Sequence, residues 1–242
     1  MQTITLLEKE ALTDSLFHVR FSRPEHWDYQ AGQFARIGLD IGSTEPVFRA
    51  YSMSSNPTEA TLDFLIKRVE GGILSPKLTD LPVGAPVLLD GNAEGNLLPS
   101  RIPGGDTMWF FATGAGLAPF LSLLKDPTAL NEWSTIVLAL SARTVKEANA
   151  LADAAIATHN PKLRVIAATT REASPLEGRL PGLIEAGRIE ALAEHALTTD
   201  SARVMLCGNP DFIKEMRALL KTRDLVSPRF GKPGQLLVES LW

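Results

Sequence analysis

The sequence predicts two domains, an antiparallel β-barrel over residues 1–100 and a doubly wound α/β domain with a parallel sheet over residues 101–242. Two hydrophobic patterns meet at a segment rich in Pro and Gly, residues 98–105. Before it, short runs of alternating polar and apolar residues recur between turn residues, as is typical of antiparallel strands. After it, apolar strands alternate with helical segments, which favours a parallel sheet covered by helices.

The first domain is expected to consist of short strands. They are predicted at residues 17–21, 33–37, 48–53, 61–69 and 86–89. After the strand that ends at Val69, Gly71 and Gly72 predict a tight turn. Ser75 and Pro76 then predict the N-cap and the first turn of a short helix.

The second domain is expected to alternate strands with helices. Strands are predicted at residues 108–112, 135–140, 164–168 and 203–206, and helices at residues 118–124, 145–159, 187–195 and 210–221. In such a sheet, ligands bind in the crevice at the carboxyl ends of the strands. Residues that directly follow these strands are therefore the candidates for a binding site.

Composition limits the function. The chain has 242 residues with 45% hydrophobic and 21% charged content, which is ordinary for a globular protein. Its net charge of −4 argues against a general nucleic-acid binder. No apolar run reaches the roughly 18 residues of a membrane span and no secretion signal is evident, so we expect a cytoplasmic protein without membrane attachment. A monomer suffices for everything in the sequence.

Cys207 is the single cysteine. It cannot form an internal disulfide, and this chain cannot supply four cysteines to an iron–sulfur cluster. We also expect no metal site. At the end of an apolar strand, Cys207 can also be simply a small buried side chain.

Arg49, Tyr51 and Ser52 lie on one predicted strand, where Arg49 and Tyr51 share a face. A guanidinium there can bind a phosphate while the ring lies along a flavin and the hydroxyl bonds the edge of that ring. The same residues fit an exposed charge, a half-buried ring and a polar strand edge. The turn before Ser75 offers a second phosphate site, because a helix N-terminus attracts anions.

Thr113, Gly114, Ala115 and Gly116 stand between a strand and a helix, where glycines allow a pyrophosphate to approach the backbone. This pattern fits a nicotinamide dinucleotide, an adenosine-based methyl donor, or a tight connection without a ligand.

Arg143 follows the predicted strand 135–140, and Thr170 and Arg171 follow the predicted strand 164–168. Arg179 lies in the next loop and can close the same pocket. A forked guanidinium suits the extra phosphate of NADP, so these positions favour NADP over NAD. The alternative is a set of solvated surface arginines.

Five segments together resemble one family. Residues 49–52, 72–75, 113–116 with Pro119, 207–210 and 238–242 occur in the order seen in ferredoxin–NADP reductases, and the chain looks most like their bacterial branch. The resemblance covers nearly the whole chain. It implies an FAD-binding domain followed by an NADP-binding domain, with hydride exchange between NADP(H) and FAD.

The resemblance and the residue patterns together give the candidate site. For FAD the candidates are Arg49, Ala50, Tyr51, Ser52, Leu65, Ile66, Lys67, Gly72, Ile73, Leu74, Ser75, Ala115, Leu241 and Trp242. For NADP(H) they are Thr113, Gly114, Arg143, Thr170, Arg171, Arg179, Gly208, Asn209 and Asp211, with Asn209 to Asp211 capping the last helix. Ser52, Cys207 and Glu239 are the candidate catalytic residues; Cys207 is expected beside the nicotinamide in a positioning role. The alternative without a functional role is that Ser52 is an ordinary strand hydroxyl and Glu239 a surface carboxylate.

The end of the chain departs from the family. Plant-type members end in Glu, one residue and Tyr, and the position of that tyrosine is Leu241 here, followed by Trp242. We expect Trp242 to lie on the adenine of FAD. Which of the two residues covers the flavin ring stays open.

The family's partners are acidic ferredoxins or flavodoxins. Six basic residues near the end of the chain, opposed only by Glu215 and Asp224, provide a complementary charge: Lys214, Arg217, Lys221, Arg223, Arg229 and Lys232. The alternative is a solvated surface. Two other functions also remain open, a flavin reductase and a non-enzymatic FAD-binding electron-transfer subunit of an oxygenase complex.

Overall fold

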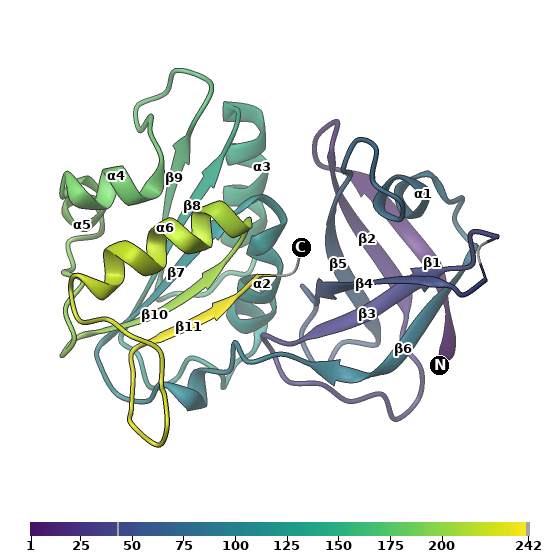
Figure 1. Ribbon diagram of the computed structural model, residues 1–242, viewed down its shortest axis with the longest axis horizontal. Coiled ribbons are helices and arrows are strands. Elements are labelled where there is room, and N and C mark those ends of the chain that lie inside the picture. Colours follow the sequence, from purple (N-terminus) through teal and green to yellow (C-terminus); the bar gives the residue numbers. More distant parts are fainter. Residues whose placement is uncertain (43, 241–242) are drawn as a thin grey trace.

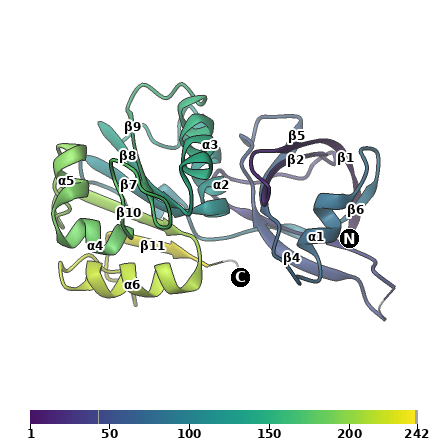
Figure 2. The ribbon, with the colours of Figure 1, turned by 90° about the horizontal axis from the view of Figure 1, so that it is seen from above.

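A computed structural model describes residues 1–42 and 44–240 and has two domains side by side (Figures 1 and 2). The first sheet has the strand order β4-β3-β6-β1-β2-β5. Its strands are β1 (Gln2–Ala11), β2 (Leu16–Ser22), β3 (Phe34–Leu39), β4 (Val47–Ser52), β5 (Thr61–Lys67) and β6 (Pro86–Glu94), and all pairs are antiparallel. A bridge between Met53 and Phe64 joins the two edge strands. The sheet therefore closes into the predicted barrel.

Apolar side chains on alternate strand positions fill the barrel, as Ile4 and Phe21 illustrate. The short helix α1 (Ser75–Asp80) adds Leu78 to this core. Beyond β6 the chain passes through the 3-10 helix η1 (Pro99–Arg101) into the second domain.

The second domain has a parallel sheet in the order β11-β10-β7-β8-β9. These strands are β7 (Thr107–Thr113), β8 (Thr135–Ala142), β9 (Leu163–Thr169), β10 (Ala202–Cys207) and β11 (Leu236–Glu239). The connecting helices are η2 (Gly114–Leu117), α2 (Ala118–Lys125), α3 (Val145–Ile156), α4 (Leu180–Glu185), α5 (Arg188–Ala193) and α6 (Pro210–Lys221).

Helices cover both faces of this sheet. Figure 2 shows α2 and α3 on one side and α4, α5 and α6 on the other. Phe110 of β7 packs towards the first pair and stacks on Phe120, with 4.5 Å between ring centres. Its neighbours Trp109 and Phe111 face the other helices. Because alternate residues of β7 are buried in two different cores, the sequence of this strand is apolar throughout. The parallel sheet with helices on both faces confirms the predicted doubly wound fold.

The two domains share one hydrophobic cluster. Leu65 and Leu97 from the barrel side pack with Leu117 and Phe120. Ser122 Oγ donates to the Ser55 carbonyl at 2.6 Å, which adds a polar contact across the same boundary. The domains therefore hold a defined relative position, which matters for any site between them.

Several local predictions need correction. Leu74, not Ser75, occupies the N-cap position of α1, and no side chain caps that helix. The Ser75 hydroxyl instead accepts a hydrogen bond from the Val69 N–H at 3.0 Å, so it stabilises the preceding turn. Strand β5 ends at Lys67 rather than Val69.

Two helices are shorter than the sequence predicts, and two strands and one α-helix were not predicted. α3 ends at Ile156 rather than at His159, whose φ of 52° lies in the left-handed region. α5 ends at Ala193 because Glu194 follows with φ of 58°. The unpredicted strands and α-helix are β1, β11 and α4; the 3-10 helices η1 and η2 were not predicted either.

Candidate active site

The candidate site forms where the order of the parallel sheet reverses. From β7 the chain builds β8 and β9 on one side and β10 and β11 on the other, so a crevice opens at the carboxyl ends of β7 and β10. Thr113 ends β7 and Cys207 ends β10. Predicted residues from two distant segments therefore meet here.

Two glycines allow the turns after β7 and β10 to pack together. A Cβ on Gly116 would lie 2.3 Å from the Cys207 carbonyl oxygen, and a Cβ on Gly208 would lie 2.2 Å from Thr113 Oγ1. Thr113 Oγ1 accepts a hydrogen bond from the Asn209 backbone N–H at 3.0 Å. Asn209 in turn caps α6, as predicted, because its Oδ1 accepts from the Phe212 N–H at 2.9 Å. The crevice therefore has a fixed floor between two helix N-termini.

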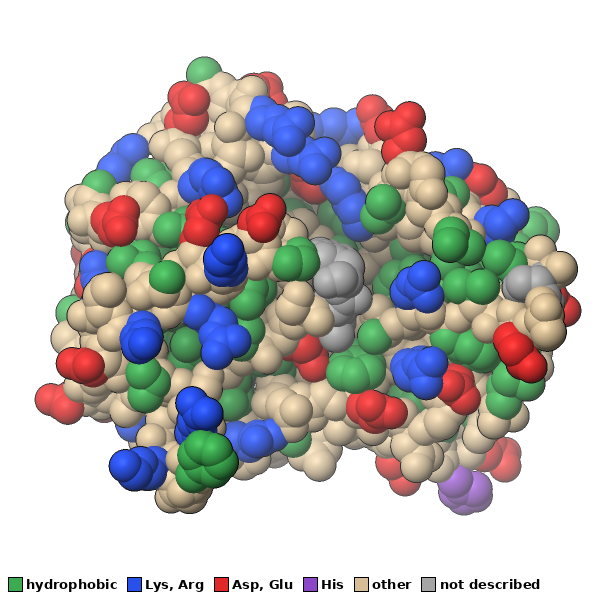
Figure 3. All heavy atoms as spheres, in the orientation of Figure 1, with side chains coloured by type: hydrophobic (Ala, Val, Ile, Leu, Met, Phe, Trp, Pro, Cys, Tyr) green, Lys and Arg blue, Asp and Glu red, His purple; other side chains and the backbone are tan. Residues whose placement is uncertain are grey.

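A cavity of about 810 Å³ opens above this floor and is lined by cations. Ten of the predicted residues line it: Lys67, Thr113, Gly114, Ala115, Arg143, Thr170, Arg171, Arg179, Asn209 and Asp211. In the surface view, basic side chains gather at the upper end of the hollow between the domains (Figure 3). Such a lining suits a ligand with several phosphates.

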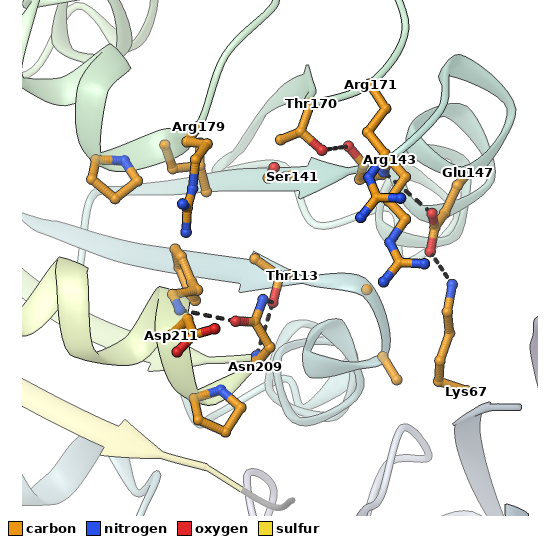
Figure 4. Close-up of a pocket in the computed structure, with 17 residues that line it drawn as sticks. Lys67, Thr113, Ser141, Arg143, Glu147, Thr170, Arg171, Arg179, Asn209 and Asp211 are labelled. Atoms are coloured by element: carbon orange, nitrogen blue, oxygen red, sulfur yellow. Dashed lines mark hydrogen bonds and ion pairs between the residues drawn. The ribbon is translucent and has the colours of Figure 1, made fainter. Parts of the chain in front are cut away.

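Arg143 and Arg171 are brought together by backbone hydrogen bonds beyond the ends of β8 and β9. The Arg171 N–H donates to the Arg143 carbonyl at 3.0 Å, and the Thr170 N–H donates to the Ala142 carbonyl at 3.0 Å. Within residues 1–42 and 44–240, neither guanidinium makes an ion pair. Both side chains are exposed and point into the pocket, whereas Arg179 enters from another side and pairs with Glu215 at 2.9 Å (Figure 4). Arg143 and Arg171 are thus free to bind an anion.

Glu147 also lines this cavity, but it was not predicted from the sequence. Its backbone N–H donates to Thr144 Oγ1 at 3.2 Å, and its Oε2 accepts from the Arg143 N–H at 3.3 Å. Its Oε1 pairs with Lys67 at 2.7 Å. The spacing from Thr144 to Glu147 is that of a capping box, a signal that would have placed this carboxylate at the start of α3.

A smaller pocket lies on the other side of η2. Its lining includes the predicted residues Ala50, Tyr51, Ser52, Leu65, Ala115, Cys207 and Gly208, together with Gly116. Ser52 Oγ and Glu239 Oε2 are buried, and each lacks a hydrogen-bond partner among the described residues. Glu239 lies outside this lining, opposite Cys207 on the neighbouring strand. The unpartnered Ser52 hydroxyl in a pocket that Tyr51 also lines fits a ligand with a flat ring and a polar edge, as a flavin has.

Burial holds the ionisable groups here in their neutral forms. It raises the pKa of the Cys207 thiol well above its ordinary value; Glu239 adds to the rise and the nearby Ser52 hydroxyl opposes it. Burial also raises the pKa of Glu239 to about 8, although the Asn96 backbone N–H opposes the shift. The pKa of Tyr51 rises to about 12 for the same reason, with Arg49 opposing. A neutral thiol is a poor nucleophile, which supports the predicted positioning role of Cys207.

Several other predicted FAD residues lie outside the linings of both pockets. Arg49 is exposed on β4 and donates to the Phe48 carbonyl at 2.7 Å. Ile66 and Leu74 face the barrel core. Gly72, Ile73 and Ser75 form the turn into α1, in which the Gly72 N–H donates to the Val69 carbonyl at 2.9 Å.

Three further residues were predicted to bind FAD: Lys67, Leu241 and Trp242. Lys67 lies in the larger pocket with the NADP(H) candidates. Leu241 and Trp242 lie outside the described residues.

Comparisons with known proteins agree with this arrangement. The family model of the oxidoreductase FAD-binding domain matches residues 3–96, and that of the oxidoreductase NAD-binding domain matches residues 110–218. These matches define the chain as an oxidoreductase with a flavin-binding and a nicotinamide-nucleotide-binding domain.

Similar proteins narrow the class. Ferredoxin–NADP reductase A of Sorangium cellulosum (strain So ce56) is 37% identical over 97% of this chain and 88% of its own length. Flavodoxin/ferredoxin–NADP reductase of Escherichia coli (strain K12) is 34% identical over 95% of this chain and 94% of its own. A ferredoxin NADP+ reductase from Neisseria gonorrhoeae, solved with bound FAD and NADP, is 33% identical with a TM-score of 0.93 and covers 99% of this chain and 98% of that one. This chain belongs to the ferredoxin–NADP reductase family, as its motifs predicted.

Proposed function

We propose that this chain is a ferredoxin– or flavodoxin–NADP reductase. It binds FAD between the barrel and η2, exchanges hydride between FAD and NADP(H), and passes electrons singly to or from a ferredoxin or flavodoxin. The observation that carries this function is the meeting of the two pockets at Ala115, which lines both. A dinucleotide in the larger pocket can therefore reach a ring in the smaller one.

The residues supply orientation and electrostatics. When bound, FAD supplies the acceptor for a hydride and can release the electrons one at a time. Tyr51 supports the ring, and the unpartnered Ser52 hydroxyl is available to its polar edge. Cys207 lines the smaller pocket from the α/β domain, and Glu239 beside it stays protonated at neutral pH. Hydride transfer needs close and aligned donor and acceptor atoms, which these packed side chains provide.

Arg143 and Arg171 select NADP(H) over NAD(H) in this proposal. Both guanidiniums point into the larger pocket and are unpaired within the described part of the chain. They are therefore available to the extra phosphate of NADP, which a planar, forked donor binds well.

The test is an anaerobic visible spectrum of the purified protein before and after NADPH, and then NADH. We expect a flavin band that NADPH bleaches quickly and NADH much more slowly. Replacing Arg143 and Arg171 by Ala should retain FAD and raise the Michaelis constant for NADPH by about two to four orders of magnitude, since each of the two lost charged hydrogen bonds costs about 1.5–3 kcal/mol. Arg188→Ala, an exposed arginine outside both pockets, is the matched control.

Three results would overturn the proposal: a colourless protein, a flavin that NADPH leaves oxidised, or equal rates with NADPH and NADH. Rapid turnover of added free flavin with weak FAD retention would favour a flavin reductase. Little NADPH oxidation in the presence of tightly held FAD would favour an electron-transfer subunit.

The partner is, in this proposal, an acidic electron carrier that meets the basic face of α6 and the following loop. Lys214, Arg217 and Lys221 are exposed on α6 and make no ion pair among the described residues, whereas Arg223 is paired with Glu190 at 2.7 Å. In the loop, Phe230 is 89% exposed, and the Arg229 guanidinium lies 4.9 Å from its ring centre. Basic side chains surround a large apolar one at the lower left of Figure 3. An apolar anchor within a positive rim suits an acidic protein partner.

This surface is tested by charge reversal. Lys214→Glu with Arg217→Glu should raise the Michaelis constant for ferredoxin or flavodoxin, more so at low salt, and leave NADPH reduction of the flavin unchanged. Lys77→Glu on α1 is the control. An unchanged constant for both carriers would remove this face from the proposal.

We infer a cytoplasmic monomer that works without nucleic acid or membrane contact. The negative net charge supports the first exclusion. None of the helices in the described ranges is long and apolar enough to cross a bilayer. Light scattering of the purified protein measures its mass directly; a dimer would refute the monomer.

A further inference from the structure

Glu147 is an acidic side chain in a pocket lined by four cations, Lys67, Arg143, Arg171 and Arg179. Its side chain is only 8% exposed. Its Oε1 lies 3.9 Å from the position that a Cβ would take on Gly114, in the turn where the proposed function places a pyrophosphate. A carboxylate at this position repels phosphate unless a cation neutralises it.

The fold requires a hydrogen-bond acceptor at this position. Thr144 and Glu147 have the spacing of a capping box: Thr144 Oγ1 accepts from the Glu147 N–H, while Glu147 Oε2 accepts from the N–H of Arg143, one residue before the N-cap. That bond holds the loop that carries the Arg143 guanidinium into the pocket. A capping box accepts Gln as well as Glu, so the acceptor is needed but its charge is not.

The neutralising cation comes from the other domain. Lys67 is the last residue of β5 in the barrel, and its Nζ lies 2.7 Å from Glu147 Oε1 at the start of α3. The lysine side chain is 21% exposed, so the pair is shielded from solvent and salt. In Figure 4 Lys67 reaches Glu147 from below, on the same side of the pocket as Arg143 and Arg171.

We infer that Lys67 is a specificity-determining residue that acts through Glu147: by neutralising this carboxylate it allows the pocket to accept the phosphates of NADP(H). The inference rests on the proposed function and adds to it a dependence of NADP(H) affinity on the contact between the domains. NADP(H) carries one more phosphate than NAD(H), so an unneutralised Glu147 disfavours NADP(H) more.

The test measures nucleotide binding to the FAD-loaded protein by titration calorimetry. NADP+ is titrated directly, and NAD+ is measured by displacement. The variants are Lys67→Met, Glu147→Gln and the double variant, with Lys77→Met, an exposed lysine of α1, as the matched control. A thermal unfolding curve for each variant shows that it is folded.

Lys67→Met is expected to weaken NADP+ binding on the order of tenfold, the effect of one unscreened charge several ångströms from a phosphate. NAD+ binding should change less. Glu147→Gln should bind NADP+ at least as tightly as the wild type, and the double variant should regain most of the affinity that Lys67→Met loses. Lys77→Met should leave both affinities unchanged.

Each other outcome overturns the inference. A double variant as weak as Lys67→Met would mean that Lys67 binds the phosphate directly. Equal losses for NADP+ and NAD+, together with a lower melting temperature, would make the pair a structural tie only. Wild-type protein that holds FAD and fails to bind NADP+ would instead refute the proposed function, so the two failures are distinguishable.

Discussion

Replacing Glu239 by Gln is expected to remove a large part of the pH dependence of stability. Glu239 is 9% exposed, its Oε2 has no partner among the described residues, and its pKa in the folded chain is raised to about 8. An unfolded chain releases this proton near the ordinary pKa of 4.5. Stability therefore falls as pH rises from about 4.5 to about 8 and levels off above, with no cost below the lower value. At about 1.4 kcal/mol per pH unit, the cost approaches about 5 kcal/mol.

Urea unfolding of the FAD-free protein at pH 5 to 8.5 measures this cost. The free energy of unfolding of the wild type should fall relative to that of Glu239→Gln by several kcal/mol over this range. Glu70→Gln, which changes an exposed carboxyl after β5, is the control and should keep the slope of the wild type. Parallel curves for the wild type and Glu239→Gln would refute the idea that the fold holds a neutral carboxyl at this position.

Other predictions follow from single contacts. Gly116→Ala should destabilise the fold by about 1–3 kcal/mol and weaken NADP+ binding, because the new Cβ meets the backbone of β10; a calorimetric titration and a urea curve that match the wild type would contradict this. Asp63→Asn should cost about 3 kcal/mol in urea unfolding at pH 7, because it removes the buried carboxylate that pairs with the half-buried Arg20, 2.9 Å away. Burial opposes ionisation of Asp63, but His18 and Arg20 outweigh it and hold the pKa well below its ordinary 3.8. Its contribution is therefore full above about pH 4 and declines in more acidic solution; a loss below 1 kcal/mol at pH 7 would count against the pair.

The sequence predicted those parts of the fold whose signal is local. Each strand of the α/β domain from β7 to β10 is an apolar run that directly precedes a glycine or polar turn, so its type and place were readable. β11 has four residues and gains its strand conformation by pairing with β10. α4 contains Pro181 and Gly182, two poor helix formers, and packing of Leu183 and Ile184 into the core stabilises it. Such elements depend on tertiary contacts and leave little trace in the local pattern.

The candidate site likewise contains residues that local sequence signals predicted and contacts that they did not. Thr113 and Gly114 were predicted because the glycine turn after a strand is a local signal, whereas Gly208 was predicted through the resemblance to the family. Lys67 was assigned to FAD together with its neighbours Leu65 and Ile66. In the structure its partner Glu147 lies 80 positions further along the chain. No periodicity or spacing reports a contact of that range, and so the pairing of Lys67 with Glu147 could not be derived from sequence, although most other residues of the larger pocket were predicted.

The smaller pocket shows why the two domains act as one unit. Its walls come from both: Ala50, Tyr51, Ser52 and Leu65 belong to the barrel, and Ala115, Gly116, Cys207 and Gly208 belong to the α/β domain. Neither domain alone builds it. The shared core beneath, with Leu65 in contact with the cluster around Leu117, fixes the distance between the two halves. Hydride transfer tolerates little error in that distance, so the packing between the domains is itself part of the catalytic geometry.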